Sequence, residues 1–258
     1  MSLVKLERRG TIGVVTLDRP EALNAISSSM ADQLAGAFRE VGGDPSIWVM
    51  VLSAAGEKAF SVGADLKERA TFSLEDFHDN RRQIKGMFQA LRQIPQPTVA
   101  AVFGYALGGG FELALSCDLI VADEDSEMGL PETRVGLLPA GGGTQLLTRR
   151  VGPGRAKDLI LRGKRIDAME ALRLGLVVEV ATQGDVGTWA LNIANDVCRS
   201  SPVAAREAKR AIDAALGVPL EEGIEIEHDS WTRVIASKDR DEGIAAFNEK
   251  RDPDWSNS

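Results

Sequence analysis

The sequence contains few histidines and few cysteines. Only His78 and His228 occur among its 258 residues, each in a charged segment expected to form an exposed helix. This scarcity argues against most mechanisms that use a histidine base and against histidine-rich metal sites. Cys117 and Cys198 match no metal-ligand spacing and no disulfide framework. We therefore expect no bound metal, a buried Cys117 and a reducing, cytoplasmic location.

An excess of positive charge is also missing. The formal net charge is −8, so a generally basic surface for nucleic acid is not expected. No apolar run is long enough to cross a bilayer, and residues 1–10 contain no apolar signal core. Neither a nucleic acid nor a membrane is expected as a partner.

The chain does contain enough apolar material for a large core, with 44% hydrophobic and 26% charged residues. Continuous apolar runs predict buried strands, and apolar residues at helical spacing predict helices between them. The predicted strands are 11–17, 47–53, 98–103 and 118–122, and the predicted helices are 27–43 and 75–93. This alternation favours an α/β fold with parallel strand pairing.

The pattern changes after about residue 143, where helical spacing dominates. The predicted helices are 143–150, 153–162, 167–174, 186–200, 202–216, 220–236 and 239–249. The last of these are amphipathic and have no strand pattern between them. We expect a catalytic core over residues 1–198 and a helical region over 199–258 that covers the core or makes subunit contacts.

Glycines cluster in GYALGGGFE, residues 104–112, where a predicted strand leads into a helix. Without Cβ atoms, the backbone can approach a ligand closely, and the helix start presents unpaired amides. The phosphate-binding glycine motifs are absent, so an anionic oxygen that forms during a reaction fits better than a phosphate. An equally good interpretation is that the glycines only allow tight packing of the helix on the sheet.

Two further loops follow predicted strands: AFSVGADLK, residues 59–67, and MGLPETRVGLLPAGGGTQ, residues 128–145. Loops after strands of an α/β fold commonly meet at one crevice. Here they would bring together Glu112 and Glu132, and paired carboxylates can perform acid–base chemistry without histidine. Considered alone, Glu112 is explained as a carboxylate in the first turn of a helix, where the helix dipole favours negative charge. Glu132, considered alone, is explained as a loop residue paired with Arg134.

Five stretches, in order, resemble the enoyl-CoA hydratase/isomerase (crotonase) superfamily. They are DRPEALNAIS, KAFSVGADLKE, GYALGGGFELALSCD, GLPETRVGLLPAGGGTQ and DRDEGIAAFNEKRDP, and together they extend over essentially the whole chain. The set is far more specific than any single glycine run. The resemblance implies a ββα spiral core with C-terminal helices that build a homo-oligomer, either a trimer or a dimer of trimers.

The resemblance also implies roles for individual residues. The amides of Ala64 and Gly109 would form an oxyanion hole around a thioester carbonyl, and Glu112 and Glu132 would be the catalytic carboxylates. The residues implied to contact coenzyme A are Ala22, Ala64, Asp65, Leu66 and Lys67, together with Phe247 and Lys250 reaching from a neighbouring subunit. No separate cofactor is implied, because coenzyme A is part of the substrate.

The two glutamates favour one of the reactions that this family performs. Members that keep both carboxylates resemble hydratases, which add water to a 2-enoyl-CoA to give a 3-hydroxyacyl-CoA, as in β-oxidation of fatty acids. Glu112 would take a proton from water, and Glu132 would deliver one to Cα. A Δ3,Δ2-enoyl-CoA isomerase and a non-catalytic acyl-CoA-binding subunit are the alternatives.

Two positions depart from the usual hydratase pattern. Ala140 replaces a glycine near the expected water, so its methyl could crowd the site or need another backbone angle, and Phe111 is bulkier than usual. Segment 68–93, expected at the acyl end of the pocket, is most simply an amphipathic helix with a charged outer face. In the other interpretation, Arg81 or Arg82 meets a carboxylated acyl tail, as in the methylglutaconyl-CoA hydratases that the C-terminal third resembles.

Overall fold

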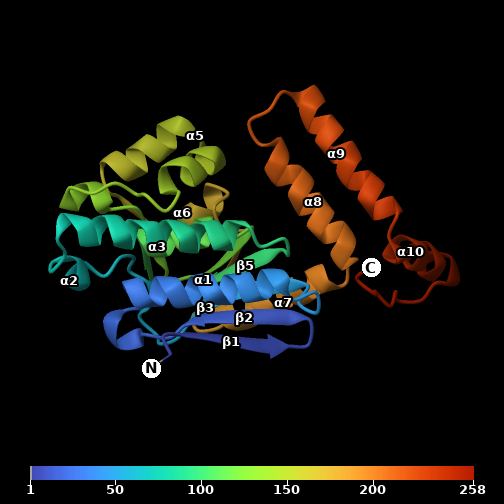
Figure 1. The fold of residues 1–258 in the computed structure, drawn as a ribbon, viewed down its shortest axis with the longest axis horizontal. Coiled ribbons are helices and arrows are strands. Elements are labelled where there is room, and N and C mark those ends of the chain that lie inside the picture. Colours follow the sequence, from blue (N-terminus) through green and yellow to red (C-terminus); the bar gives the residue numbers. More distant parts are fainter. Residues whose placement is uncertain (1) are drawn as a thin grey trace.

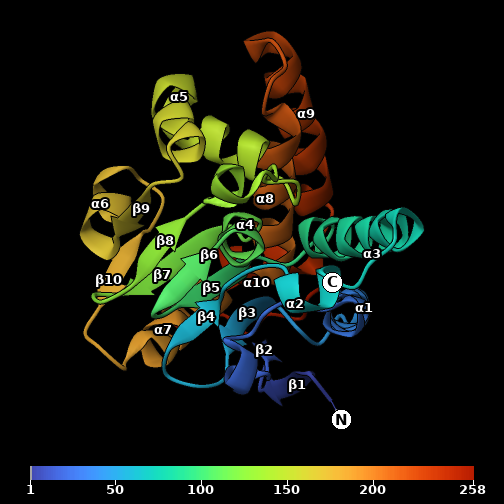
Figure 2. The same ribbon diagram turned by 90° about the vertical axis from the view of Figure 1, so that its left-hand side faces the viewer.

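Two β-sheets form the centre of the molecule in a computed structural model that describes residues 2–258 (Figures 1 and 2). The larger sheet has the order β1 (Val4–Arg9), β2 (Ile12–Leu17), β3 (Val49–Ala54), β5 (Thr98–Val102), β7 (Leu119–Asp123) and β10 (Glu179–Ala181). The smaller sheet has the order β4 (Ala59–Ser61), β6 (Tyr105–Leu107), β8 (Glu127–Gly129) and β9 (Arg165–Asp167). Neighbouring strands are parallel except β1–β2 and β8–β9. The predicted α/β fold with parallel pairing is therefore confirmed.

The four predicted strands correspond to β2, β3, β5 and β7. The sequence analysis missed β1, whose side chains after Val4 are mostly exposed at the sheet edge. It also missed the five three-residue strands β4, β6, β8, β9 and β10. Three residues are too few to show either an alternating pattern or a continuous apolar run, so only pairing in three dimensions defines these strands.

The helices surround the sheets and agree closely with the predicted segments. They are α1 (Ser28–Gly43), α2 (Leu66–Arg69), α3 (Leu74–Arg92), α4 (Gly109–Leu115), α5 (Gly143–Leu161), α6 (Ala168–Arg173), α7 (Val186–Cys198), α8 (Pro202–Ala215), α9 (Leu220–Ile235) and α10 (Lys238–Glu249), with 3₁₀ turns η1 (Pro20–Ala22) and η2 (Glu132–Val135). The two segments predicted around residue 152 form α5, which kinks where Gly152 has φ 75°. Among residues 2–258, none of these helices has the length and apolar character needed to span a membrane.

A three-element unit recurs along the chain: a strand of the larger sheet, a strand of the smaller sheet, then a helix. The three copies are β3–β4 followed by α2 and α3, β5–β6 followed by α4, and β7–β8 followed by η2 and α5. This is the ββα order that the family resemblance implied. Because the smaller-sheet strands β4, β6 and β8 are neighbours, the loops that follow them open at the same edge.

Both faces of the larger sheet are buried. On one face, valines such as Val14, Val51 and Val99 pack with Val186 and Ala190 of α7. On the other face lies the main core, which contains Phe38, Phe60, Phe88 and Phe111 at 2% exposure or less, as well as Cys117. Burial on both faces explains why the central strands are continuous apolar runs in the sequence.

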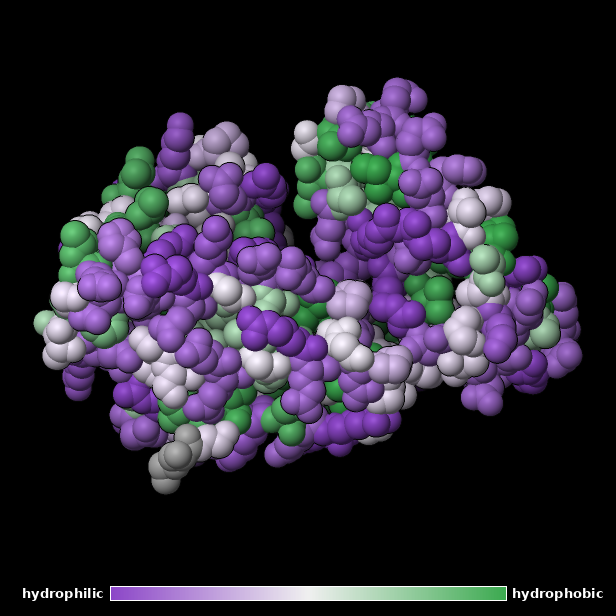
Figure 3. All heavy atoms as spheres, in the orientation of Figure 1, coloured by the Kyte–Doolittle hydropathy of each residue, from purple (hydrophilic) through white to green (hydrophobic). Residues whose placement is uncertain are grey.

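Helices α8, α9 and α10 project from this body as an arm (Figure 1). Lys209 of α8 ties the arm to the core, since its Nζ donates to Asp118 Oδ2 at 2.7 Å and to the Gln96 carbonyl at 3.0 Å. The arm carries exposed apolar side chains, including Ile212, Leu216, Leu220, Ile224 and Trp231. The space-filling view shows apolar surface on the upper part of the arm, across a gap from the body (Figure 3). The division at residues 1–198 and 199–258 stays a prediction.

The glycines before α4 have different structural roles. A Cβ at Gly110 would lie 2.1 Å from the Ser61 carbonyl oxygen, so this glycine allows the helix to pack on β4. Gly108 has φ 54°, a conformation that favours glycine, and it forms the turn itself. At Gly109 the nearest atom to an added Cβ is 3.5 Å away, so packing does not require glycine there.

We expect Gly110→Ala to lower the free energy of unfolding by about 1–3 kcal/mol, because the new methyl meets backbone rather than a movable side chain. The matched control is Gly86→Ala in α3, where an added Cβ has no neighbour within 4 Å. That change is expected to stabilise by about 0.5–1 kcal/mol through helix propensity. Urea unfolding gives the free energy of unfolding of each variant relative to the wild type. Equal changes in the two variants would contradict the packing argument.

Candidate active site

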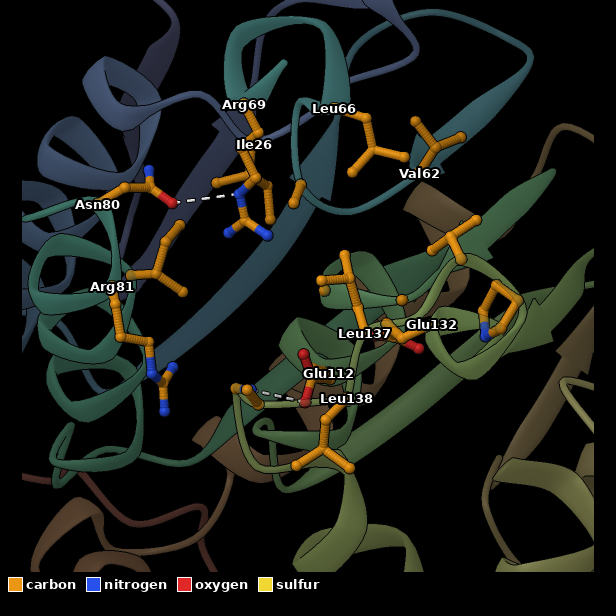
Figure 4. Close-up of a pocket in the computed structure, with 18 of the residues that line it drawn as sticks. Ile26, Val62, Leu66, Arg69, Asn80, Arg81, Glu112, Glu132, Leu137 and Leu138 are labelled. Atoms are coloured by element: carbon orange, nitrogen blue, oxygen red, sulfur yellow. Dashed lines mark hydrogen bonds between the residues drawn. The ribbon is translucent and has the colours of Figure 1, made fainter. Parts of the chain in front are cut away.

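A cavity of about 540 Å³ lies where the loops after β4, β6 and β8 meet (Figure 4). Helix α3 closes its other side with Phe77, Ile84 and Phe88. The loops contribute Val62, Ala64, Leu66, Gly108, Gly109, Pro131, Glu132, Leu137, Leu138 and Ala140. The three loops that the sequence analysis expected at one crevice therefore do converge, and segment 68–93 lines the cavity as expected.

Two backbone amides lie beside each other in this cavity. The turns of Gly63 and Gly109 are in contact, since a Cβ at Gly63 would lie 2.7 Å from the Gly109 nitrogen. A Cβ at Gly109 would lie 3.7 Å from the Ala64 nitrogen. Ile26 holds the first turn by accepting from the Asp65 amide and donating to the Gly63 carbonyl.

Neither the Ala64 amide nor the Gly109 amide donates a hydrogen bond to another residue within 2–258. The Gly109 amide also lies at the start of α4, where the helix dipole adds positive potential. Two fixed donors of this kind can stabilise a negative oxygen that develops during a reaction. The backbone thus has the form that an oxyanion hole requires.

Glu112 lies in the first turn of α4, with only 3% of its surface exposed. Its Oε1 accepts from the amides of Gly141 and Gly143, both at 2.7 Å. Burial raises the pKa of Glu112, while the amides of Gly141–Gly143 and the charge of Arg81 act in the opposite direction. The carboxylate is therefore fixed in direction, with Oε2 left for another partner.

Glu132 comes from η2 and lies on the other side of the Gly108 turn. A Cβ at Gly108 would lie 3.1 Å from Glu132 Oε1, so the glycine leaves room for the carboxylate. Its Oε2 is buried without a hydrogen-bond partner. Burial, together with the nearby charge of Glu112, raises the pKa of Glu132 to about 7.

The interpretation of Glu132 as a loop residue paired with Arg134 is wrong. Arg134 does not pair with Glu132, because its guanidinium donates to the carbonyls of Arg162 and Gly163. Glu112 does lie in the first turn of its helix, where a helix-dipole carboxylate is expected, and its Oε1 also accepts from the loop before α5. Two carboxyl groups in one cavity, both with raised pKa values, can exchange protons with a bound molecule.

The residues implied to contact coenzyme A are distributed unevenly. Ala64 and Leu66 line the cavity, and Leu66 is 51% exposed at its edge. Asp65 is turned inward, where it caps α2 through the amides of Lys67 and Glu68 and pairs with Arg19 at 2.6 Å. Ala22 in η1 and the exposed Lys67 lie outside the cavity lining.

Phe247 and Lys250 are not brought to the cavity of their own chain. Both are exposed on the arm, Phe247 to 84%, at the end of α10. The arm extends away from the body in Figure 1. Their contact with the coenzyme A site of a neighbouring subunit stays a prediction.

The two residues that depart from the usual pattern occupy different environments. Ala140 has no positive φ, so the expected change of backbone angle is not needed there, and its side chain is exposed at the cavity wall. Phe111 is 1% exposed in the main core, as packing against the sheet requires.

The sequence analysis missed several residues that shape the cavity. It read Gly141 and Gly143 only as a helix start, although three consecutive glycines before a helix are a signal for backbone donors. It also missed Arg92, whose Nη1 donates to the Gly141 carbonyl at 2.8 Å and so positions the loop. Arg69 and Asn80 line the cavity as well. No local sequence pattern distinguishes these polar residues from other residues of a solvated helix.

A family model for enoyl-CoA hydratase/isomerase matches residues 7–258. The chain belongs to this family. The probable enoyl-CoA hydratase echA8 of Mycobacterium bovis is 41% identical over 253 residues, 98% of this chain and 97% of that protein. The crystal structure of an enoyl-CoA hydratase from Bacillus anthracis has a TM-score of 0.97 and 38% identity, with 100% of both chains covered.

A further relative, the short-chain-enoyl-CoA hydratase of Clostridium acetobutylicum, is 36% identical and covers 96% of this chain and 95% of that protein. These similarities confirm the predicted crotonase fold and the prediction of an enzyme of the hydratase type. They extend along the arm as well as the body, since the matched structures cover the whole chain.

The raised pKa of Glu132 predicts how stability depends on pH. Its folded pKa of about 7 exceeds the ordinary value of 4.5, so the folded state holds this proton more tightly than the unfolded chain. The wild type should therefore lose stability as pH rises from about 4.5 through about 7. Glu132→Gln removes this loss and should be more stable by about 1–2 kcal/mol above pH 8, since the carboxyl is only partly buried.

Thermal or urea unfolding between pH 4.5 and pH 8.5 measures this difference. The matched control is Glu57→Gln, because Glu57 is exposed and forms no ion pair within residues 2–258. If the difference in unfolding free energy between Glu132→Gln and the wild type is the same at every pH in this range, the pKa of Glu132 is not raised and the prediction is wrong.

Proposed function

We propose that this family member is an enoyl-CoA hydratase, which adds water across the α,β double bond of a 2-enoyl-CoA to give a 3-hydroxyacyl-CoA. The observation that carries the proposal is the common cavity: Glu112 and Glu132 face the same space as the unpaired amides of Ala64 and Gly109. Hydration needs both components, because negative charge develops on the thioester oxygen while one proton leaves the attacking water and another is added to Cα.

In the proposed reaction, the amides of Ala64 and Gly109 donate to the thioester carbonyl. They stabilise the enolate oxygen that forms when water attacks Cβ, and losing one such donor costs about 2.7–4 kcal/mol of barrier. Glu112, held by the Gly141 and Gly143 amides, accepts the proton of the attacking water. Glu132, whose pKa of about 7 leaves it partly protonated near neutral pH, supplies the proton to Cα.

The remaining contacts with coenzyme A follow from the family resemblance. We propose that Leu66, Asp65 and Ala22 lie along the pantetheine and adenosine path and that Lys67 meets the phosphates. Asp65 would act there through its backbone, since its carboxylate is engaged with Arg19 and the start of α2. The reaction requires no metal and no redox cofactor, and we place it in the cytoplasm, in β-oxidation.

The competing function is a Δ3,Δ2-enoyl-CoA isomerase. A single carboxyl group with a pKa of about 7, such as Glu132, is suited to carry one proton between two carbons. In that reaction Glu112 would have no chemical step. Mass analysis separates the functions, because hydration adds one water and isomerisation conserves mass.

We expect the purified protein to consume crotonyl-CoA, with loss of the conjugated thioester absorbance and gain of one water. Glu112→Gln and Glu132→Gln should each lower kcat by at least about 10²-fold, the usual contribution of a positioned acid or base. Glu57→Gln is the control for a carboxylate outside the cavity.

If the product has the same mass as the substrate, the protein is an isomerase and the hydratase proposal is wrong. If longer, branched and carboxylated enoyl-CoAs are bound but not converted, the protein is a binding subunit. If Glu112→Gln lowers kcat and Glu132→Gln does not, then Glu132 has no role in the proposed mechanism.

We also propose that the arm builds a trimer or a dimer of trimers, in which Phe247 and Lys250 reach a neighbouring cavity. The exposed apolar side chains of α8 and α9 support an interface there, since such patches mark association sites. Light scattering should give the mass of three or six chains, and Trp231→Glu, at a residue 56% exposed, should lower it. A monomeric wild type would overturn this assembly.

A further inference from the structure

Arg92 lies in the last turn of α3 and is not part of the cavity lining. A cation in the last turn of a helix is explained by the helix dipole alone. The guanidinium group, however, reaches another element, since its Nη1 donates to the Gly141 carbonyl, 49 residues away in the chain, at 2.8 Å. The same Nη1 would lie 3.4 Å from a Cβ at Gly142. Arg92 therefore packs against the loop that directs Glu112.

This loop has little rigidity of its own. Gly141, Gly142 and Gly143 are consecutive, and glycine loses more conformational freedom on folding than any other residue. Gly142 has φ 133°, a backbone conformation that residues with a side chain rarely adopt. Among residues 2–258, only the side chains of Glu112 and Arg92 form hydrogen bonds with these three glycines. Arg92 is therefore the one side-chain anchor of the loop that is not itself a reacting group.

The contact from Arg92 is connected to Glu112 through a single peptide group. The Gly141 carbonyl and the Gly142 amide belong to that group. Arg92 donates to its oxygen, and the Gly142 amide is one of the three amides that oppose the rise in the pKa of Glu112 caused by burial. A hydrogen bond at one end of a peptide group polarises it and strengthens the hydrogen bond at the other end.

Charged groups face Glu112 from three elements. Burial raises the pKa of Glu112, and the charge of Arg81 in α3 opposes this rise. Burial lowers the pKa of Arg69 in α2 and of Arg92, and the charge of Glu112 opposes that change. The pKa of Glu132 in η2 is raised by burial and by the charge of Glu112. Of the three arginines, Arg92 is the one that hydrogen-bonds to the loop holding Glu112.

Direct charge attraction is not the main effect of Arg92. It forms no ion pair within the described part of the chain, residues 2–258, and it remains partly exposed, so water screens its charge. A hydrogen bond to a fixed carbonyl depends on geometry instead. The influence of Arg92 on Glu112 is therefore expected to follow from the position of the loop.

We propose that Arg92 is a positioning residue for hydration, which fixes the Gly141 carbonyl and so holds the amides of Gly141–Gly143 where they direct the Glu112 carboxylate. This role rests on the proposed hydratase function, in which Glu112 takes the proton of the attacking water. Arg92 itself touches neither the substrate nor the water. Without its contact, the amides stabilise the charged carboxylate less well, so Glu112 is less well directed and is protonated more readily.

The test is Arg92→Met, which removes the donor but keeps most of the aliphatic stem. With crotonyl-CoA we expect kcat to fall by about tenfold or more and KM to change by less than about threefold, because orientation of the base is lost rather than contact with the substrate. The acidic limb of kcat/KM against pH should move to higher pH, since Glu112 must be ionised to act as a base. Arg92→Lys keeps a donor and should recover part of kcat.

Lys85→Met is the matched control. Lys85 is an exposed cation of the same helix and forms no hydrogen bond or ion pair within residues 2–258. It should leave kcat and the pH profile unchanged, and thermal unfolding confirms that every variant is folded at the assay temperature. An acidic limb that stays in place in Arg92→Met, or a rise in KM without a fall in kcat, would overturn the positioning role.

Hydrogen–deuterium exchange of the segment 139–145 tests the loop without any reaction. The amides of Gly141–Gly143 should exchange at least about tenfold faster in Arg92→Met than in the wild type, and at an unchanged rate in Lys85→Met. If this difference appears but the wild type hydrates no enoyl-CoA, the positioning of the loop stands and the hydratase proposal fails. If the wild type hydrates crotonyl-CoA and Arg92→Met changes neither exchange nor kcat, the hydratase stands and the positioning role fails.

Discussion

The hydrogen bonds from the amides of Gly141 and Gly143 to Glu112 Oε1 are the constraint on which the cavity depends. They join the helix that opens after β6 to the loop that precedes α5. Only glycine fits at residue 141, because a Cβ there would lie 2.2 Å from the Phe88 ring and 2.8 Å from Glu112 Oε2. Arg92 secures the same loop through the Gly141 carbonyl. A buried carboxylate thus receives partners without any histidine or arginine in direct contact.

This arrangement makes the two glutamates chemically different. Backbone amides donate hydrogen bonds to Glu112. Glu132, in contrast, has a buried oxygen with no hydrogen-bond partner among residues 2–258, and the negative charge of Glu112 raises its pKa further. Burial raises the pKa of both carboxyl groups; the amides of Gly141 and Gly143 oppose this rise at Glu112, whereas the pKa of Glu132 reaches about 7. In the proposed reaction, a protein whose two histidines are both exposed obtains an acid and a base from the same residue type.

The recurring strand–strand–helix unit explains why these groups meet. Each passage from the larger to the smaller sheet ends in a loop, and β4, β6 and β8 are adjacent, so consecutive loops lie side by side. The Gly63 and Gly109 turns touch for this reason, and Glu132 lies against Gly108. Helix α3 closes the cavity from the other side and contributes Asn80 and Arg81 to its lining.

The sequence by itself determined the central strands, nearly all the helices, the family and the two glutamates. Apolar runs such as 47–53 and the glycine-rich blocks are local patterns, and local patterns can be recognised without pairing partners. It could not determine the three-residue strands, because their hydrogen bonds join segments far apart in the chain. It also could not identify the partners of Glu112, the free amides, or which of Arg81 and Arg82 lines the cavity. Those depend on which side chains and amides share one cavity, and only the packing of α2, α3 and the loops decides that.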